Sequence, residues 1–222
     1  MMNKRAFKDH VYGLIVQLVK AMGNAHRLEI IDLLSQGEFS VEQVAEEVRL
    51  SIANTSQHLQ ILRKAQLVKK RREGNFIYCS LFDLQVFHAW MALRDLAYEN
   101  IDEIARIIDR DHKKNNGLRI ITLQELLPKL QRREVILIDV RPAAEFSVGH
   151  LPEAINIPIN ELIEKMPFLD KSADYVAYCR GPLCVFADQA VKLLNKHGYK
   201  AIRMLEGFPD YLLSDQQFKK AS

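Results

Sequence analysis

Residues 175–194 read YVAYCRGPLCVFADQAVKLL, and this stretch decides the fold of the C-terminal half of the chain. Residues 175–178 form a short apolar run, which is typical of a buried strand. Cys179 follows directly, and then the turn residues Gly181 and Pro182. Apolar residues next recur with helical spacing, at Ala187, Ala190, Val191 and Leu194. Strand, loop and helix in this order predict a parallel α/β unit, in which ligands lie at the carboxyl ends of the strands.

The sequence around this stretch continues the α/β pattern. Residues 135–140 (VILIDV) predict a second buried strand, and residues 201–205 predict a third strand after a helix stop at Gly198. Residues 121–127 predict a short strand-like entry and a capped helix. Upstream, residues 111–117 (DHKKNNG) are polar and end the preceding helical pattern. We therefore expect one domain at residues 1–110, a linker at 111–118 and a second domain at 119–222.

The N-terminal half has mostly helical spacing. A first amphipathic helix carries apolar residues at three- and four-residue steps, namely Phe7, Val11, Leu14, Ile15, Leu18 and Met22. A second helix ends near Gly37, and Ser40 with Gln43 predicts a capping box that opens a third. Ser51 predicts the N-cap of a fourth helix that ends at about Ala65 and turns Ile52, Leu59 and Leu62 inward.

A hairpin and a long helix complete this half. Strand-like residues on both sides of Glu73-Gly74-Asn75 predict a β-hairpin between Lys69 and Ser80. Residues 84–110 then predict one long helix with an apolar stripe at Val86, Trp90, Leu93, Ala97, Ile101, Ile104 and Ile108. Two interpretations stay open. The stripe is either a dimer seam shared with the first helix, or part of an ordinary core.

Helix, tight turn, helix and basic hairpin are the order of a winged helix-turn-helix. The residues that carry the pattern are 24–31 (NAHRLEII), 37–41 (GEFSV), 50–59 (LSIANTSQHL) and 62–68 (LRKAQLV), and with them the chain resembles the ArsR family of bacterial repressors. The resemblance implies a homodimer that binds a double-stranded DNA operator. In such a dimer the second helix of the motif enters the major groove, and each hairpin wing follows the DNA backbone.

The residue chemistry agrees with this interpretation. The helix that begins after Ser51 offers amides and hydroxyls that can read base edges, and we predict contacts from Asn54, Thr55, Ser56, Gln57 and Gln60. From Arg63 to Arg72 there are six basic residues and no acidic one. Of these we predict phosphate contacts from Lys69, Lys70, Arg71 and Arg72. The alternative for the amides and the basic residues is an ordinary solvated surface, and Thr55 could face either inward or outward.

Many ArsR proteins sense metals through paired cysteines or through histidines and carboxylates. This half of the chain has a single cysteine, Cys79, which we expect to be a buried filler on the wing strand. His88 has no second histidine at a ligand-like spacing. Because zinc and related ions need about four converging donors, we expect no metal site and no cofactor.

A second resemblance covers residues 119–215. Residues 138–141 (IDVR), 145–146 (EF), 149–158 (GHLPEAINIP), 178–181 (YCRG) and 205–208 (LEGF) closely resemble a rhodanese domain. The expected fold class is thus a mainly α winged helix-turn-helix domain followed by an α/β rhodanese domain with a parallel sheet. Asp139 and Arg141 are charged residues at a strand end, and we expect them to form an ion pair that holds loops in place.

The resemblance implies sulfur transfer through Cys179. A thiol between a strand and a helix lies near backbone N–H groups and the positive end of the helix dipole, which lower its pKa and favour a thiolate. A thiolate can accept a sulfane sulfur from thiosulfate, polysulfide or a persulfide donor. The predicted catalytic residues are Cys179, Arg180, Gly181 and Cys184. Cys184 is either a resolving thiol that bridges to Cys179 or a packing residue.

These features lead to one principal hypothesis and two alternatives. Three cysteines, no long apolar run and no signal-peptide core favour a cytoplasmic protein without a membrane partner. We expect a dimeric repressor whose rhodanese domain senses or transfers reactive sulfur through Cys179. The first alternative is a sulfurtransferase or an arsenate-reductase-like enzyme that carries a DNA-binding domain. The second is a rhodanese fold that serves only for partner binding.

Overall fold

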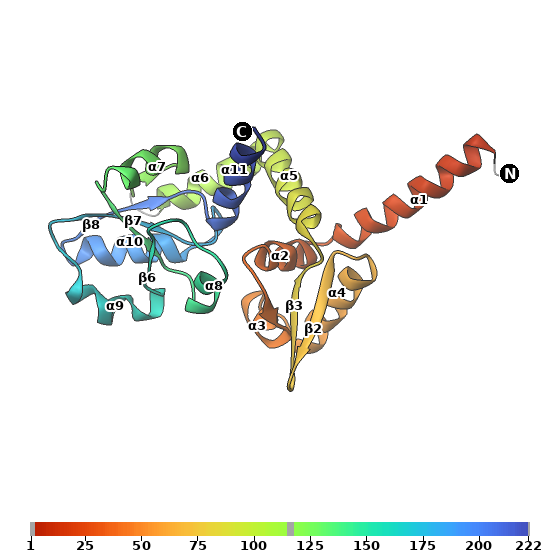
Figure 1. Cartoon of the computed structure of the whole chain (residues 1–222), viewed down its shortest axis with the longest axis horizontal. Coiled ribbons are helices and arrows are strands. Elements are labelled where there is room, and N and C mark those ends of the chain that lie inside the picture. The colour runs from red at the N-terminus through yellow and green to blue at the C-terminus, as the bar shows by residue number, and fades with distance from the viewer. Residues whose placement is uncertain (1–2, 115–117, 222) are drawn as a thin grey trace. The chain divides into compact units, whose positions relative to one another are not determined.

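The computed structural model describes residues 3–114 and 118–221 of the chain. The chain divides into two compact units, which are residues 1–93 and residues 94–222 (Figure 1). The predicted linker at 111–118 includes residues 115–117, which lie outside the described residues. The predicted domain limits stay predictions.

The first unit contains helices α1 to α4, the first part of α5 (Leu84–Asn100) and a small antiparallel sheet among its described residues. In chain order its elements are α1 (Lys4–Met22), α2 (Ala25–Leu34), β1 (Phe39–Ser40), α3 (Val41–Glu47), α4 (Ile52–Lys64), β2 (Val68–Glu73) and β3 (Phe76–Leu81). Strands β2 and β3 form the predicted hairpin, and β1 pairs with the other edge of β3. This is the architecture of a winged helix-turn-helix.

Local sequence signals set the helix starts in this unit. The Ser40 hydroxyl accepts from the N–H of Gln43, whose side chain accepts from the N–H of Ser40, so the predicted capping box is confirmed. The Ser51 hydroxyl accepts from the N–H of Asn54 and confirms the second predicted cap. Leu59 and Leu62 of α4 are buried as expected, but Ile52 is exposed because it stands in the first turn of the helix, ahead of the core.

Helix α1 is largely uncovered by its own unit. Only Ala21 and Met22, at its C-terminal end, are buried. The apolar side chains along the rest of the helix are exposed, including Phe7, Val11, Leu14, Ile15 and Leu18. Figure 1 shows α1 extending away from α2, α3 and α4. The amphipathic pattern of the sequence therefore faces solvent in the single chain.

The long helix predicted over residues 84–110 is wrong as a single element. The structure has α5 (Leu84–Asn100) and α6 (Asp102–Lys114), separated at Ile101. The Asn100 side chain donates to the carbonyl of Leu96, a local bond that competes with helix continuation. Asp102 and Glu103 then occupy the first turn of α6, where acidic residues are favourable. The apolar periodicity of the sequence continues across Ile101, although local interactions end α5 before this residue and begin α6 after it.

The second unit holds a five-stranded parallel sheet. After α6 its elements are β4 (Ile120–Ile121), α7 (Leu123–Gln131), β5 (Ile136–Asp139), α8 (Ala143–Val148), β6 (Ile155–Asn156), η1 (Ile159–Glu161), α9 (Leu162–Lys165), η2 (Met166–Phe168), β7 (Asp174–Tyr178), α10 (Phe186–Lys196), β8 (Lys200–Met204) and α11 (Phe208–Ala221). The strand order is β4-β8-β7-β5-β6, and each pairing is parallel. The predicted parallel α/β architecture is confirmed.

Each face of this sheet has its own core. Ile138 and Ala177 point to the face covered by α9 and α10, where they pack with Leu162, Ala190 and Leu194. Leu137 and Val176 point to the other face, where residues of α7 and α11 cover them. Alternate burial along β5 and β7 follows from the twofold period of a strand. The central strand β7 is thus fixed on both faces, and its carboxyl end leads directly into Cys179.

Candidate functional site

Helix α4 presents a polar surface in the first unit. Asn54, Gln57 and Gln60 are exposed, and Ser56 is half-buried. Thr55 is 0% exposed, so its predicted contact with a base is wrong. It shares the buried face with Leu59, one turn further along the helix. The accessible amide side chains of α4 therefore come from positions 54, 57 and 60.

The wing strands carry the predicted basic residues. Lys69, Lys70, Arg71 and Arg72 of β2 are all exposed. The guanidinium of Arg71 is bonded to the carboxylates of Glu38 and Glu73 and lies over the Tyr78 ring. Those two carboxylates raise the pKa of Arg71 further and hold its charge. Cys79 on β3 is fully buried, which confirms the expected filler role, and burial raises the pKa of its thiol to about 11.

In the second unit, the carboxyl end of β7 leads to two neighbouring thiols. Cys179 follows Tyr178 directly and is 1% exposed, whereas Cys184, just before α10, is half-buried. The Cys179 thiol donates to the carbonyl oxygen of Cys184 at 3.5 Å, and the Cys179 thiol also acts to lower the pKa of Cys184. The structure thus brings together the two cysteines that the sequence places five positions apart.

Backbone N–H groups converge on this thiol pair. The N–H groups of Gly181 and Ala187 act to lower the pKa of Cys179, and those of Arg180 and Phe186 act to lower the pKa of Cys184. The donors come from the loop and from the first residues of α10, as expected for a thiol that precedes a helix. This arrangement can stabilise one negative charge on the pair.

The lowered pKa that we expected at Cys179 is found at Cys184. Burial raises the pKa of Cys179, while the hydrogen bond from the Cys179 thiol lowers the pKa of Cys184 to about 7. Cys179 lies deeper, where a charge is less well solvated, and its burial opposes a thiolate at that sulfur. The two groups titrate as a pair that shares one proton at neutral pH.

Two charged pairs surround the loop. Arg180 donates to Glu145 of α8 at 3.0 and 2.6 Å, and its charge also favours the thiolate of Cys184. Arg141 donates to both carboxylate oxygens of Asp139, and both side chains are 0% exposed. Arg141 also donates to the carbonyl of Gly149 and so ties the segment after α8 to the end of β5.

Glycines allow close backbone contacts around the loop. Gly181 has a φ of +135°, a conformation that favours glycine. A Cβ atom on Gly207 would lie 2.4 Å from the carbonyl carbon of Arg180. The backbone before α11 therefore rests directly on the loop. Asp210 of α11 accepts from the N–H of Gly207 and pairs with Arg94 of α5 at 2.6 Å.

Two buried charged residues that contact each other next to the loop were not predicted from the sequence. Arg203 of β8 and Asp188 of α10 form a buried ion pair, with N–O distances of 3.0 and 2.9 Å. The available signal was a charged residue inside each buried apolar pattern: arginine in the strand AIRML and aspartate in the first turn of α10. Buried charges are seldom present without a partner.

Comparison with known proteins agrees with both halves of this structure. Residues 24–70 match the bacterial regulatory proteins of the arsR family, and residues 122–211 match the rhodanese-like domain. The HTH-type transcriptional regulator Rv0324 of Mycobacterium tuberculosis is 36% identical over 200 residues, which are 90% of this chain and 88% of that protein. The chain belongs to the arsR family and carries a rhodanese-like domain.

Two shorter matches correspond to the two halves of this ArsR-family regulator. The HTH-type transcriptional regulator KmtR of Mycobacterium tuberculosis is 31% identical over 113 residues, 51% of this chain and 84% of that protein. The adenylyltransferase and sulfurtransferase MOCS3 of Drosophila yakuba is 42% identical over 57 residues, 23% of this chain and 13% of that protein. The protein is accordingly a DNA-binding transcriptional regulator.

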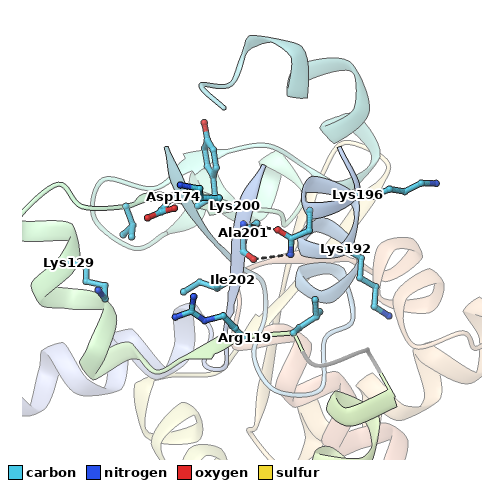
Figure 2. Close-up of a pocket in the computed structure, with 12 residues that line it drawn as sticks. Arg119, Lys129, Asp174, Lys192, Lys196, Lys200, Ala201 and Ile202 are labelled. Atoms are coloured by element: carbon cyan, nitrogen blue, oxygen red, sulfur yellow. Dashed lines mark hydrogen bonds between the residues drawn. The ribbon is translucent and has the colours of Figure 1, made fainter. Parts of the chain in front are cut away.

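The rhodanese-like domain of the regulator also has a basic cavity of about 780 Å³ (Figure 2). Asp174 and Lys200, which begin β7 and β8, help to line the cavity. It therefore lies at the amino ends of the strands, opposite the loop of residues 179–185 that carries Cys179 and Cys184, here called the thiol loop. Its other charged residues are Arg119, Lys129, Lys192 and Lys196. Among the described residues that line this cavity there is no cysteine, and both Cys179 and Cys184 follow the carboxyl end of β7.

In the described ranges, no helix is both long enough and apolar enough to span a membrane. Within those ranges there is also no group of three or more His, Cys, Asp or Glu residues arranged to hold a metal ion.

Proposed function

We propose that this ArsR-family regulator is a dimeric repressor that responds to reactive sulfur through the Cys179–Cys184 pair. One observation carries the proposal: two thiols share a loop at the carboxyl end of β7, and backbone N–H groups donate to both sulfurs. This arrangement lowers the pKa of one thiol of the pair to about 7. A thiolate is therefore present at neutral pH, which is what nucleophilic attack on sulfur requires.

The first step is sulfur uptake by Cys179 from a polysulfide. The Cys179 thiol passes its proton to the Cys184 thiolate along their hydrogen bond. The Cys179 thiolate attacks the terminal sulfane sulfur, a new S–S bond forms, and the donor leaves as a polysulfide anion shorter by one sulfur. The product is a Cys179 persulfide, and the N–H groups of Gly181 and Ala187 already face that sulfur.

The second step uses Cys184 as the resolving thiol. The Cys184 thiol passes the proton that it gained in the first step to the outer sulfur of the persulfide. The Cys184 thiolate then attacks the sulfur attached to Cys179, the persulfide S–S bond breaks, and hydrosulfide leaves. The two cysteine sulfurs are oxidised to a disulfide, and the sulfane sulfur is reduced to sulfide. The short separation in sequence and the 3.5 Å hydrogen bond from the Cys179 thiol to the Cys184 carbonyl support this pairing.

The proposed partners follow from the two units. The exposed amides Asn54, Gln57 and Gln60 and the half-buried Ser56 would contact the bases of a double-stranded operator. Lys69, Lys70 and Arg72 would contact phosphates. Arg71 is already paired with the carboxylates of Glu38 and Glu73. The exposed apolar residues of α1 support a homodimer, in which a second copy covers them. We place the protein in the cytoplasm, without a membrane partner.

Intact mass after treatment of the reduced protein with polysulfide tests the proposal. We expect wild type to gain sulfur or to lose two hydrogens as a Cys179–Cys184 disulfide, and Cys184→Ser to stop at the persulfide. Cys179→Ser should gain no sulfur, and Cys79→Ser should behave as wild type because Cys79 is buried within the first unit.

Two results would overturn this mechanism. Sulfur uptake by Cys179→Ser would make Cys184 the primary nucleophile. If the mass of the wild-type protein does not change after polysulfide treatment, the thiol pair does not respond to reactive sulfur. Repeated turnover with thiosulfate would instead favour a sulfurtransferase that carries a DNA-binding domain, and turnover with arsenate would favour a reductase.

A further inference from the structure

Arg203 contacts the thiol loop from below. Its Nη1 atom binds both carboxylate oxygens of Asp188. Its Nη2 atom points to three loop carbonyls, those of Gly181 at 3.4 Å, Pro182 at 3.2 Å and Cys184 at 3.4 Å. Arg203 is 1% exposed and is therefore a fixed part of the interior. One side chain thus joins β8, α10 and most of the loop.

These contacts set the direction of the loop peptides. In a trans peptide the C=O and the N–H point to opposite sides of the same plane, and no cis bond occurs in the described residues. Because the carbonyls of Pro182 and Cys184 turn toward Arg203, the N–H groups of Leu183 and Val185 turn to the opposite side of the loop. The Cys184 carbonyl that faces Arg203 also accepts from the Cys179 thiol at 3.5 Å. The contacts of Arg203 therefore anchor the segment that joins the Arg180 and Gly181 N–H groups to those of Phe186 and Ala187, all of which act on the pKa of the thiol pair.

We infer that Arg203, held by Asp188, is a positioning residue that keeps the loop N–H groups aimed at the Cys179–Cys184 pair. It touches no reacting atom. The pair Arg203–Asp188 is internally neutral, so its contribution is geometric and depends on the planar fork of the guanidinium, which can bind a carboxylate and several carbonyls at once. The inference rests on the proposed role of the thiol pair.

Several charged groups surround the pair and contribute to its electrostatic environment. They are Arg180 of the loop, Glu145 of α8, Asp188 of α10, Arg203 of β8 and Asp210 of α11. A single Arg203→Gln substitution would leave Asp188 buried without its partner and could unfold the domain. The double variant Asp188→Asn/Arg203→Gln removes both charges together and is the main test variant. Arg203→Lys keeps the positive charge but loses the planar guanidinium that binds a carboxylate and several carbonyls at once.

The decisive measurement is the pH profile of thiol alkylation by iodoacetamide, followed by peptide mass at Cys179 and Cys184 in the full-length protein. The double variant should show its half-maximal rate about one pH unit higher than wild type, and alkylate about tenfold more slowly near pH 7. Arg203→Lys should shift the profile in the same direction. Tyr199→Phe is the matched control, because it removes a buried hydrogen bond to Met166 in the same core without touching the loop.

Thermal unfolding of each variant establishes that the rhodanese-like domain is folded, so that the profile reports on the loop. A folded Arg203→Lys or double variant with the wild-type profile overturns the inference. If the double variant unfolds, Arg203→Lys alone decides by the same criterion. Alkylation needs no sulfur donor, so a shifted profile in a protein that takes up no sulfur from polysulfide supports Arg203 as a positioning residue while rejecting the proposed function.

Discussion

At the scale of single residues, the charge distribution in the thiol pair makes a direct prediction. Cys179→Ala removes the hydrogen bond that is the largest cause of the lowered pKa of Cys184. The pKa of Cys184 should rise from about 7 toward the usual thiol value of about 8.5. Its alkylation rate should then fall several-fold near pH 7 and recover at higher pH. A profile that still has its midpoint near 7 would contradict this assignment.

A second residue-scale prediction concerns base reading by α4. Gln57→Ala should weaken binding to the specific operator by about 1–3 kcal/mol and relax the preference at one base pair. The melting temperature should stay unchanged because the side chain is exposed. Gln189→Ala, an exposed glutamine on α10 of the rhodanese-like domain, is the matched control. Equal effects of the two substitutions on operator affinity would count against Gln57 as a base contact.

At the scale of secondary-structure elements, the wing should act on phosphates. Replacing both Lys69 and Lys70 with alanine should weaken binding to all DNA sequences alike. The slope of log affinity against log salt concentration should become shallower by about 0.9 for each phosphate that the variant no longer neutralises. Arg71→Ala should change the slope less, because Glu38 and Glu73 already hold that guanidinium. DNA titrations at several salt concentrations measure these slopes.

Helix α1 makes the second element-scale prediction. Replacing Leu14 and Ile15 with glutamate places two charges on its exposed apolar surface. In the proposed dimer these charges would be buried at the interface, so sedimentation should show a monomer with weaker operator binding and intact helical content. The same change at the exposed Ile163 of α9 should leave the oligomeric state unchanged. A variant of α1 that remains dimeric would place the interface elsewhere.

Elements whose signals are local could be predicted from the sequence. Ser40, Ser51 and the Glu73-Gly74-Asn75 turn act over a few residues, and the structure has each feature as expected. The break at Ile101 was missed because α5 and α6 continue one apolar period. Thr55 was misplaced because a hydroxyl suits both a surface and a core. The Arg203–Asp188 pair depends on β8 meeting the start of α10, a tertiary contact that no local pattern encodes.

At the scale of the whole molecule, the family assignment makes DNA binding the output, and the thiol pair is the proposed input. A ligand or modification can change DNA affinity only if the modified and unmodified proteins differ in their equilibrium between binding states. The account therefore requires a measurable free-energy coupling between the oxidation state of the loop and operator affinity. Such coupling is typically about 1–3 kcal/mol.

The coupling is measured by the operator affinity of the full-length protein before and after polysulfide treatment, with the mass of the same samples recorded. The account predicts that affinity falls at least about fivefold when wild type carries the Cys179–Cys184 modification. Affinity should return to its starting value after reduction and stay constant in Cys179→Ser. Complete modification of the thiol pair with unchanged operator affinity would contradict the account.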